Sequence, residues 1–168
     1  ATYDATKYLI AQGHTNIAMI ASDTVLDFYK QSLLGFCDAM NEAGLTANPE
    51  SCGISARDEG SAYKASEKLI SGGNTPTAIV CTVDSFAIGA MRCAKDMGFS
   101  VPNDISFIGI DDILLSRYIE PKLTTMGIDK VEMGKMAMDM LLEQIEGNSV
   151  QSVMLPMELI ERDSVKKI

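Results

Sequence analysis

The chain has 168 residues, of which 46% are hydrophobic and 22% charged, as in an ordinary globular domain. Its net charge is −9 and it lacks a cluster of lysine and arginine, so the chain alone is a poor binder of nucleic-acid phosphates. No apolar run reaches the roughly 18 residues of a membrane-spanning helix, so we expect no membrane contact.

Cysteine and histidine are too scattered to suggest a metal site. The four cysteines form no CxxC pair, and His14 is the only histidine. We expect reduced thiols, no metal and no cofactor, in a reducing compartment that we take to be the cytoplasm. His14 lies in a Gly-His turn before a strand, where a structural role is expected. The cysteines are Cys37, Cys52, Cys81 and Cys93.

Helical and strand patterns alternate along the first 110 residues. In chain order we predict a helix over 2–12, a strand over 16–21, a helix over 29–44, a weak strand over 51–55, a helix over 58–70, a strand over 77–82, a helix over 84–98 and a strand over 104–110. The strands lack polar alternation, which is typical of strands covered on both faces. The sequence therefore predicts an α/β fold with a parallel sheet and helices on both of its faces.

The alternation stops after residue 112. Residues 113–127 indicate an irregular stretch, 129–147 a long helix, and 152–165 one or two short strands. Apolar side chains of the long helix, from Val131 to Ile145, occupy more than one face, so the helix needs several packing partners. We infer that part of its surface meets a domain or a second chain outside this sequence.

Polar side chains follow each of the four predicted strands. Open parallel sheets bind their ligands beyond the carboxyl ends of the strands. We therefore expect a recognition surface for a small polar molecule at this edge. Its candidate residues are Ser22, Asp23 and Thr24, then Ser55, Ala56 and Arg57, then Val83 and Asp84, then Asp111 and Asp112.

The acidic residues of this edge allow other roles. Asp23, Asp84 and Asp111 could hold Mg²⁺ in a small α/β enzyme, and this alternative stays open. Asp84 stands before a helix and is expected to cap it. Asp112 is expected to order the following loop through local hydrogen bonds. No nucleophile elbow, phosphate loop or dinucleotide fingerprint is present, so no catalytic residue is assigned.

Two arginines near the same edge, Arg57 and Arg117, are expected to be solvated surface charges. The alternative is that they clamp an anion.

Several stretches, in order along nearly the whole chain, resemble the LacI/GalR family of bacterial transcription regulators. They are "YLIAQGHTNIAMI", "LLGFCDAMNEAGL", "PTAIVCTVDSFAIGAMRCAKDMGFSVPNDISFIGIDD", "PKLTTM", "MGKMAMDMLLEQIEG" and "LPMELIERDSV". The resemblance implies a periplasmic-binding-protein-like fold of two α/β subdomains with an effector between them. Residues 1–125 would form the second subdomain, and residues 126–168 a crossover helix and a returning strand that belong partly to a first subdomain absent from this sequence.

The resemblance also implies site residues. Asp111 matches the ligand-binding aspartate of the family, an acceptor for sugar hydroxyls. Ser32 stands where the family often has arginine, Val83-Asp84 where it often has Asn-Asp, and Ile128 where a polar contact is usual. Phe28 is expected to stack on the ligand, and the predicted ligand set is Asp111, Ser32, Phe28, Ser55 and Asp84.

The resemblance further implies a homodimer formed through this subdomain. The expected interface residues are Leu114, Leu115, Tyr118 and Ile119 with Ile88 and Met91 of the preceding helix. The chain is thus interpreted as the effector-binding and dimerisation part of a regulator, controlled by a sugar or related metabolite. Its DNA contact would come only from a helix-turn-helix module outside this sequence. A sugar-binding protein of a transport system and the magnesium enzyme remain as alternatives.

Overall fold

The computed structural model describes residues 1–22, 27–47 and 54–168. The alternation of helix and strand predicted for the first 110 residues is confirmed, with element ends shifted by a few residues. Its helices are α1 (Thr2–Ala11), α2 (Asp27–Glu42), α3 (Glu59–Ser71) and α4 (Asp84–Asp96), and its strands are β1 (Ile17–Ser22), β2 (Ile54–Ala56), β3 (Ala78–Cys81) and β4 (Ser106–Ile110). The rest of the chain adds a short 3-10 helix η1 (Leu114–Arg117), β5 (Thr124–Gly127), α5 (Lys130–Ile145) and β6 (Glu158–Ile160).

The strands form one sheet in the order β2-β1-β3-β4-β5-β6. Strands β1 to β5 are parallel, and β6 runs antiparallel to β5 at the edge. The predicted α/β fold with a parallel sheet is confirmed. Because the five strands are parallel, their carboxyl ends meet at one edge of the sheet, where ligands of such folds bind.

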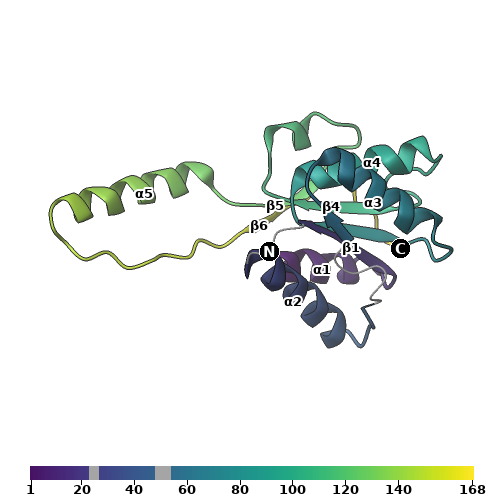
Figure 1. Cartoon of the computed structure of the whole chain (residues 1–168), viewed down its shortest axis with the longest axis horizontal. Helices are drawn as coiled ribbons and strands as arrows, with labels where there is room; N and C mark the ends of the chain where they lie inside the picture. Colours follow the sequence, from purple (N-terminus) through teal and green to yellow (C-terminus); the bar gives the residue numbers. More distant parts are fainter. Residues whose placement is uncertain (23–26, 48–53) are drawn as a thin grey trace.

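Two helical layers cover the sheet (Figure 1). Alternate side chains of β1 enter opposite cores, because successive side chains of a strand point to opposite faces. Met19 packs with Leu9 of α1 and Phe36 of α2, whereas Ile20 packs in the core formed with α3 and α4. Full burial of an apolar side chain of this size contributes about 1.5–3 kcal/mol. The two cores together fix the position of the carboxyl edge of the sheet.

The prediction of an irregular stretch over 113–127 is wrong in part, because it contains η1 and β5. The pattern does not reveal β5 because two of its three buried side chains, Thr124 and Thr125, are polar. The Thr125 hydroxyl donates to Asp84 Oδ1 at 2.6 Å, and the Thr124 backbone N–H donates to Ser164 Oγ at 2.8 Å. Internal hydrogen bonds satisfy these buried groups, as burial of polar groups requires.

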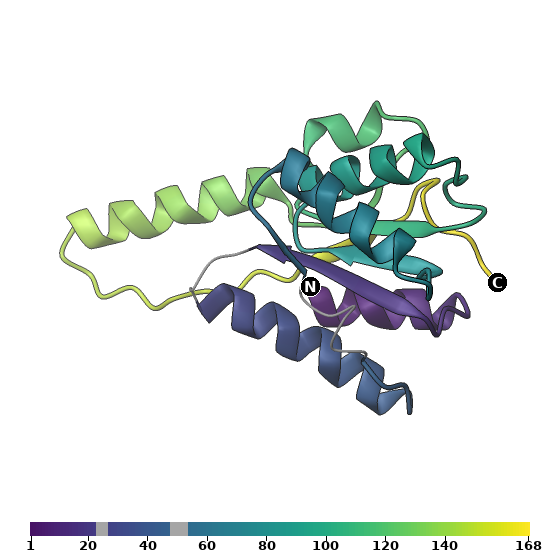
Figure 2. The same cartoon turned by 45° about the vertical axis from the view of Figure 1, so that its right-hand side comes forward.

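Helix α5 projects away from the sheet and its helices (Figures 1 and 2). None of its residues is buried, although apolar side chains are numerous along it. The inference that its packing partners lie outside the sequence stays a prediction. No helix in the described part of the chain has the length and apolar character needed to cross a bilayer. The exposed apolar residues of α5 are Val131, Met133, Met138, Leu141, Leu142 and Ile145.

The predicted structural role of His14 is confirmed. Its ring is buried, with Nε2 donating to the Lys166 carbonyl at 3.1 Å and Nδ1 lying 3.0 Å from Thr77 Oγ1. Burial lowers the pKa of His14, so the imidazole is neutral near pH 7. The ring joins the start of the sheet to the C-terminal segment.

Candidate functional site

A pocket at the carboxyl edge of the sheet brings together two of the predicted ligand-binding residues. Asp111 directly follows β4, and Ser32 lies in the first half of α2. Both line a hollow of about 350 Å³, a size typical of small-molecule sites. The other lining residues are Ala1, Thr2, Tyr3, Gln31, Gly35, Ile110 and Met157.

Close packing of α1 against α2 shapes one wall of this pocket. A Cβ atom at Gly35 would lie only 3.2 Å from the backbone nitrogen of Tyr3. Glycine therefore lets the first turn of α1 approach α2 and brings Tyr3 to the pocket.

Asp111 and Asp112 form a turn with an uncommon backbone. Their φ angles are 111° and 45°, in the region that glycine favours. Non-glycine residues held there cost about 1–3 kcal/mol each and cluster at functional sites. The Asp111 N–H donates to the Met126 carbonyl at 2.8 Å, which anchors the turn to β5. Burial, with the charge of Asp84, raises the pKa of Asp111.

Asp112 turns inward and forms two ion pairs. Arg117 Nη2 donates to Oδ2 at 2.6 Å, and Nη2 of Arg162 donates to Oδ1. Burial acts to raise the pKa of Asp112, but the two guanidinium groups outweigh it and hold the pKa below its usual value. The ion pairs therefore add stability above the pKa of the unfolded state, and this stability is lost as pH falls through the lower folded pKa. The predicted local ordering role is confirmed, and Arg117 is part of it.

Asp84 does not cap α4, and that prediction is wrong. The N-cap residue is Val83, and Asp84 is fully buried in the first turn of the helix. Its carboxylate accepts hydrogen bonds from the Ile113 N–H at 2.9 Å and from the hydroxyls of Ser116 and Thr125 at 2.6 Å each. Burial raises its pKa. The structure thus places Asp84 beneath the turn and outside the pocket lining, whereas a direct contact with ligand was predicted.

Asp23 lies outside the described residues, as do the side chains of Phe28 and Ser55. The backbone of Ser55 pairs with Ala21 of β1, at the expected edge of the sheet. Within the described part of the chain, no group of three or more His, Cys, Asp or Glu side chains could hold a metal ion.

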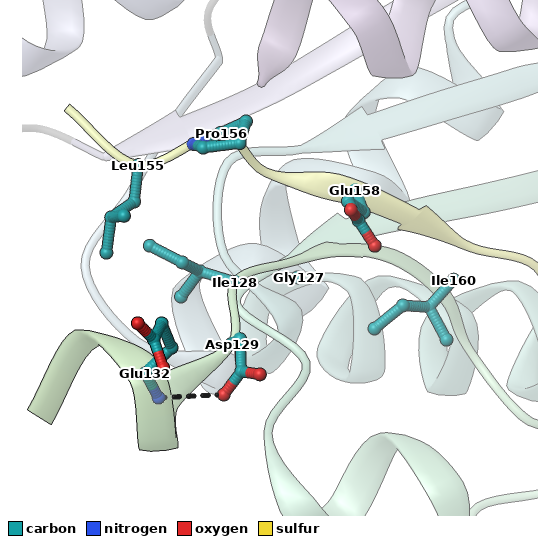
Figure 3. A pocket seen from close by; sticks show the side chains of 8 residues that line it. All are labelled: Gly127, Ile128, Asp129, Glu132, Leu155, Pro156, Glu158 and Ile160. Atoms are coloured by element: carbon teal, nitrogen blue, oxygen red, sulfur yellow. Dashed lines mark hydrogen bonds between the residues drawn. The ribbon is translucent and has the colours of Figure 1, made fainter. Parts of the chain in front are cut away.

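A second pocket, of about 440 Å³, lies where the chain leaves the sheet and returns to it (Figure 3). It is lined by Ile128 and Asp129 before α5 and by Leu155 and Pro156 on the return. The family resemblance placed Ile128 at a position where a polar ligand contact is usual. In the structure Ile128 lines this second pocket and not the one at Asp111. The carboxylate of Asp129 caps α5 by accepting from the N–H groups of Val131 and Glu132.

The predicted dimer residues differ in exposure. Leu114, Leu115 and Tyr118 are 69%, 49% and 76% exposed around η1, which is unusual for neighbouring large apolar side chains. Ile119 and Ile88 are partly buried against the core of α3 and α4. Met91, predicted at the dimer interface, is buried in that core.

The sheet order, the helices on both faces and the pocket beyond β4 are those of an α/β fold with a ligand-sized hollow at the carboxyl edge of its sheet. The family model "Periplasmic binding protein-like domain" matches residues 6–165. The chain therefore belongs to the periplasmic-binding-protein-like domain family, in the form found in LacI-type regulators.

Individual relatives agree. The HTH-type transcriptional repressor PurR of Pasteurella multocida is 39% identical over 166 residues, covering 98% of this chain and 50% of the repressor. A sugar-binding transcriptional regulator of the LacI family from Escherichia coli, solved with phosphate, superposes with a TM-score of 0.90 at 28% identity, covering 99% of this chain and 60% of that one. A dimeric Lac repressor gives a TM-score of 0.91 at 27% identity, covering 99% and 61%. The chain spans about half the length of the curated relatives it matches.

Proposed function

We propose that this chain is the effector-binding and dimerisation part of a cytoplasmic LacI-type transcription regulator. The observation that carries the proposal is the pocket in which Asp111 and Ser32 meet at the carboxyl edge of the sheet. Effector binding would favour one relative arrangement of two subdomains and so change the affinity of a DNA-binding module elsewhere in the protein.

The division of the chain follows from which residues pack on the sheet. Residues up to β5 and the segment from β6 to the C-terminus would form one subdomain, because the sheet contains both strands. Helix α5 would cross into the other subdomain, whose contacts would cover its exposed apolar side chains.

The pocket chemistry favours a neutral, hydroxyl-rich effector such as a sugar or a nucleoside. Among the lining side chains that the structure describes, Asp111 carries an acidic group and none carries a basic one. A carboxylate accepts hydrogen bonds from hydroxyl and amino groups and repels anions. Ser32, where the family often has arginine, supports the same class.

A thermal-shift screen of the full-length protein tests the proposed function. We expect a neutral monosaccharide or a nucleoside to raise the melting temperature, because a ligand that binds only the folded state stabilises it. Phosphorylated sugars are expected to have no effect. A response to phosphorylated sugars alone would contradict the proposed effector class. A full-length gene that encodes no helix-turn-helix segment upstream would contradict the proposal that the protein is a transcription regulator.

A charge placed in the exposed η1 cluster should separate the dimer. In the full-length protein, Leu115→Asp combined with Tyr118→Asp should raise the dimer dissociation constant at least about 100-fold, because an interface buries such apolar anchors away from water. Light scattering across a concentration series measures this. Leu34→Asp, at a 53% exposed leucine on α2, is the matched control and should leave the dimer intact. If the double variant stays dimeric down to the same protein concentration as the wild type, the interface lies elsewhere.

A further inference from the structure

The backbone of the Asp111-Asp112 turn is held by a side chain from α5. Lys130 Nζ donates to the carbonyl oxygens of both Asp111 and Asp112, each at 2.6 Å. In the described part of the chain, these are the two non-glycine residues with positive φ. A lysine ammonium is a compact charge with three donors, so one side chain can satisfy two adjacent carbonyls.

The position of this ammonium depends on the start of α5. Lys130 is the first residue of the helix, and the Asp129 carboxylate fixes the first turn by accepting from Val131 N–H at 2.9 Å and Glu132 N–H at 3.0 Å. Among the described residues, the side-chain hydrogen bonds that join α5 to the sheet domain are the two from Lys130. Movement of the helix base would therefore act on the turn directly.

The same ammonium acts on the Asp111 carboxylate. Burial and the charge of Asp84 both raise the pKa of Asp111, whereas the charge of Lys130 lowers it. Lys130 therefore favours the ionised form of the residue that faces the pocket.

We propose that Lys130 is a positioning residue that holds the strained Asp111-Asp112 turn and couples the pocket carboxylate to the orientation of α5. The coupling rests on the proposed function, in which α5 enters the second subdomain. Effector bound at Asp111 and movement of the helix base would then each affect the other, as linked equilibria require.

Hydrogen exchange of the full-length protein, read by mass spectrometry without any ligand, tests this role. In Lys130→Met, peptides covering 110–114 and 128–134 should both exchange about 10-fold faster or more, because the turn loses its clamp. Lys130→Arg should restore most of the protection, since it keeps the charge and the donors. Lys135→Met, at an exposed lysine on the same helix, is the matched control and should exchange like the wild type.

A titration of Asp111 separates positioning from a purely structural effect. With the aspartate carboxyl carbons labelled for NMR, and the signal assigned by its loss in Asp111→Asn, the pKa of Asp111 should rise in Lys130→Met and not in Lys135→Met. Unchanged exchange of peptide 110–114 in Lys130→Met, or an unchanged pKa, would overturn the proposal. Neither readout uses an effector or DNA, so the outcome is distinguishable from failure of the proposed function.

Discussion

The variant Asp84→Ala is expected to lose about 3–5 kcal/mol of unfolding free energy, a large effect for one substitution. The carboxylate accepts three hydrogen bonds, a half-buried one from Ile113 N–H and two buried ones from Ser116 Oγ and Thr125 Oγ1. Alanine leaves all three donors without their acceptor, and each buried unsatisfied group costs about 1–3 kcal/mol. Urea unfolding followed by circular dichroism measures the loss.

Two further variants make this prediction sharper. Asp84→Asn keeps the shape and one acceptor oxygen but turns an amide group toward donors, so its loss should be intermediate. Asp38→Ala, at an exposed aspartate on α2, should stay within about 0.5 kcal/mol of wild type. If the unfolding free energy of Asp84→Ala lies within about 1 kcal/mol of the wild-type value, the buried carboxylate does not hold this region together.

The stability difference between wild type and Asp84→Asn should depend on pH, because burial raises the pKa of Asp84. Since the folded pKa lies above the unfolded value, stability is lost as pH rises from the unfolded pKa through the folded one. Asparagine does not titrate. The stability advantage of wild type over Asp84→Asn should therefore narrow as pH increases across that window, and a widening gap would contradict the burial of the charged form.

The apolar framework of this fold was predictable because its pattern is local. Strands β1, β3 and β4 are runs of buried apolar residues, and the glycines after the helices take the positive φ expected there, as at Gly13 and Gly44. The sequence also predicts that α5 needs packing partners outside this chain, because its apolar residues cover more than one side. Each of these signals lies within about 15 consecutive residues, which is the range that periodicity can report.

The polar interior was not predictable because its partners are far apart in the sequence. Asp84 lies 32 and 41 residues from Ser116 and Thr125, and Arg162 lies 50 residues from Asp112. A single aspartate before a helix looks like a cap, whether or not such partners exist. The close approach of Asp84 Oδ1 to Gly109, where a Cβ would lie 2.1 Å away, was likewise visible only in three dimensions.

The prediction of the buried Met91 as an interface residue has a different cause. Helix α4 carries apolar residues on most of its surface, so the pattern alone does not distinguish the face toward the sheet from the face toward a partner. The structure buries Ala87, Met91 and Ala94 and leaves Ile88 only partly covered. Asp111 could be assigned to the pocket because open parallel sheets bind ligands beyond the carboxyl ends of their strands. The choice of Ser32 as its partner came from the family resemblance.

The substitution Asp111→Asn is expected to weaken effector binding about 10- to 100-fold while preserving the fold. A hydrogen bond to a charged group is worth about 1.5–3 kcal/mol, and the amide loses the charge and one of the two acceptor oxygens. Asparagine is the suitable replacement because it tolerates positive φ, whereas alanine at a φ of 111° would add strain. Asp38→Asn is the matched control on the surface of α2.

Calorimetric titration of the full-length wild type, Asp111→Asn and Asp38→Asn with the neutral compound identified by the thermal-shift screen tests the central claim most directly. The account predicts tight binding to wild type and Asp38→Asn, and binding about 10- to 100-fold weaker to Asp111→Asn at an unchanged melting temperature of the unliganded protein. Equal affinity for wild type and Asp111→Asn would contradict the claim that this carboxylate reads the effector.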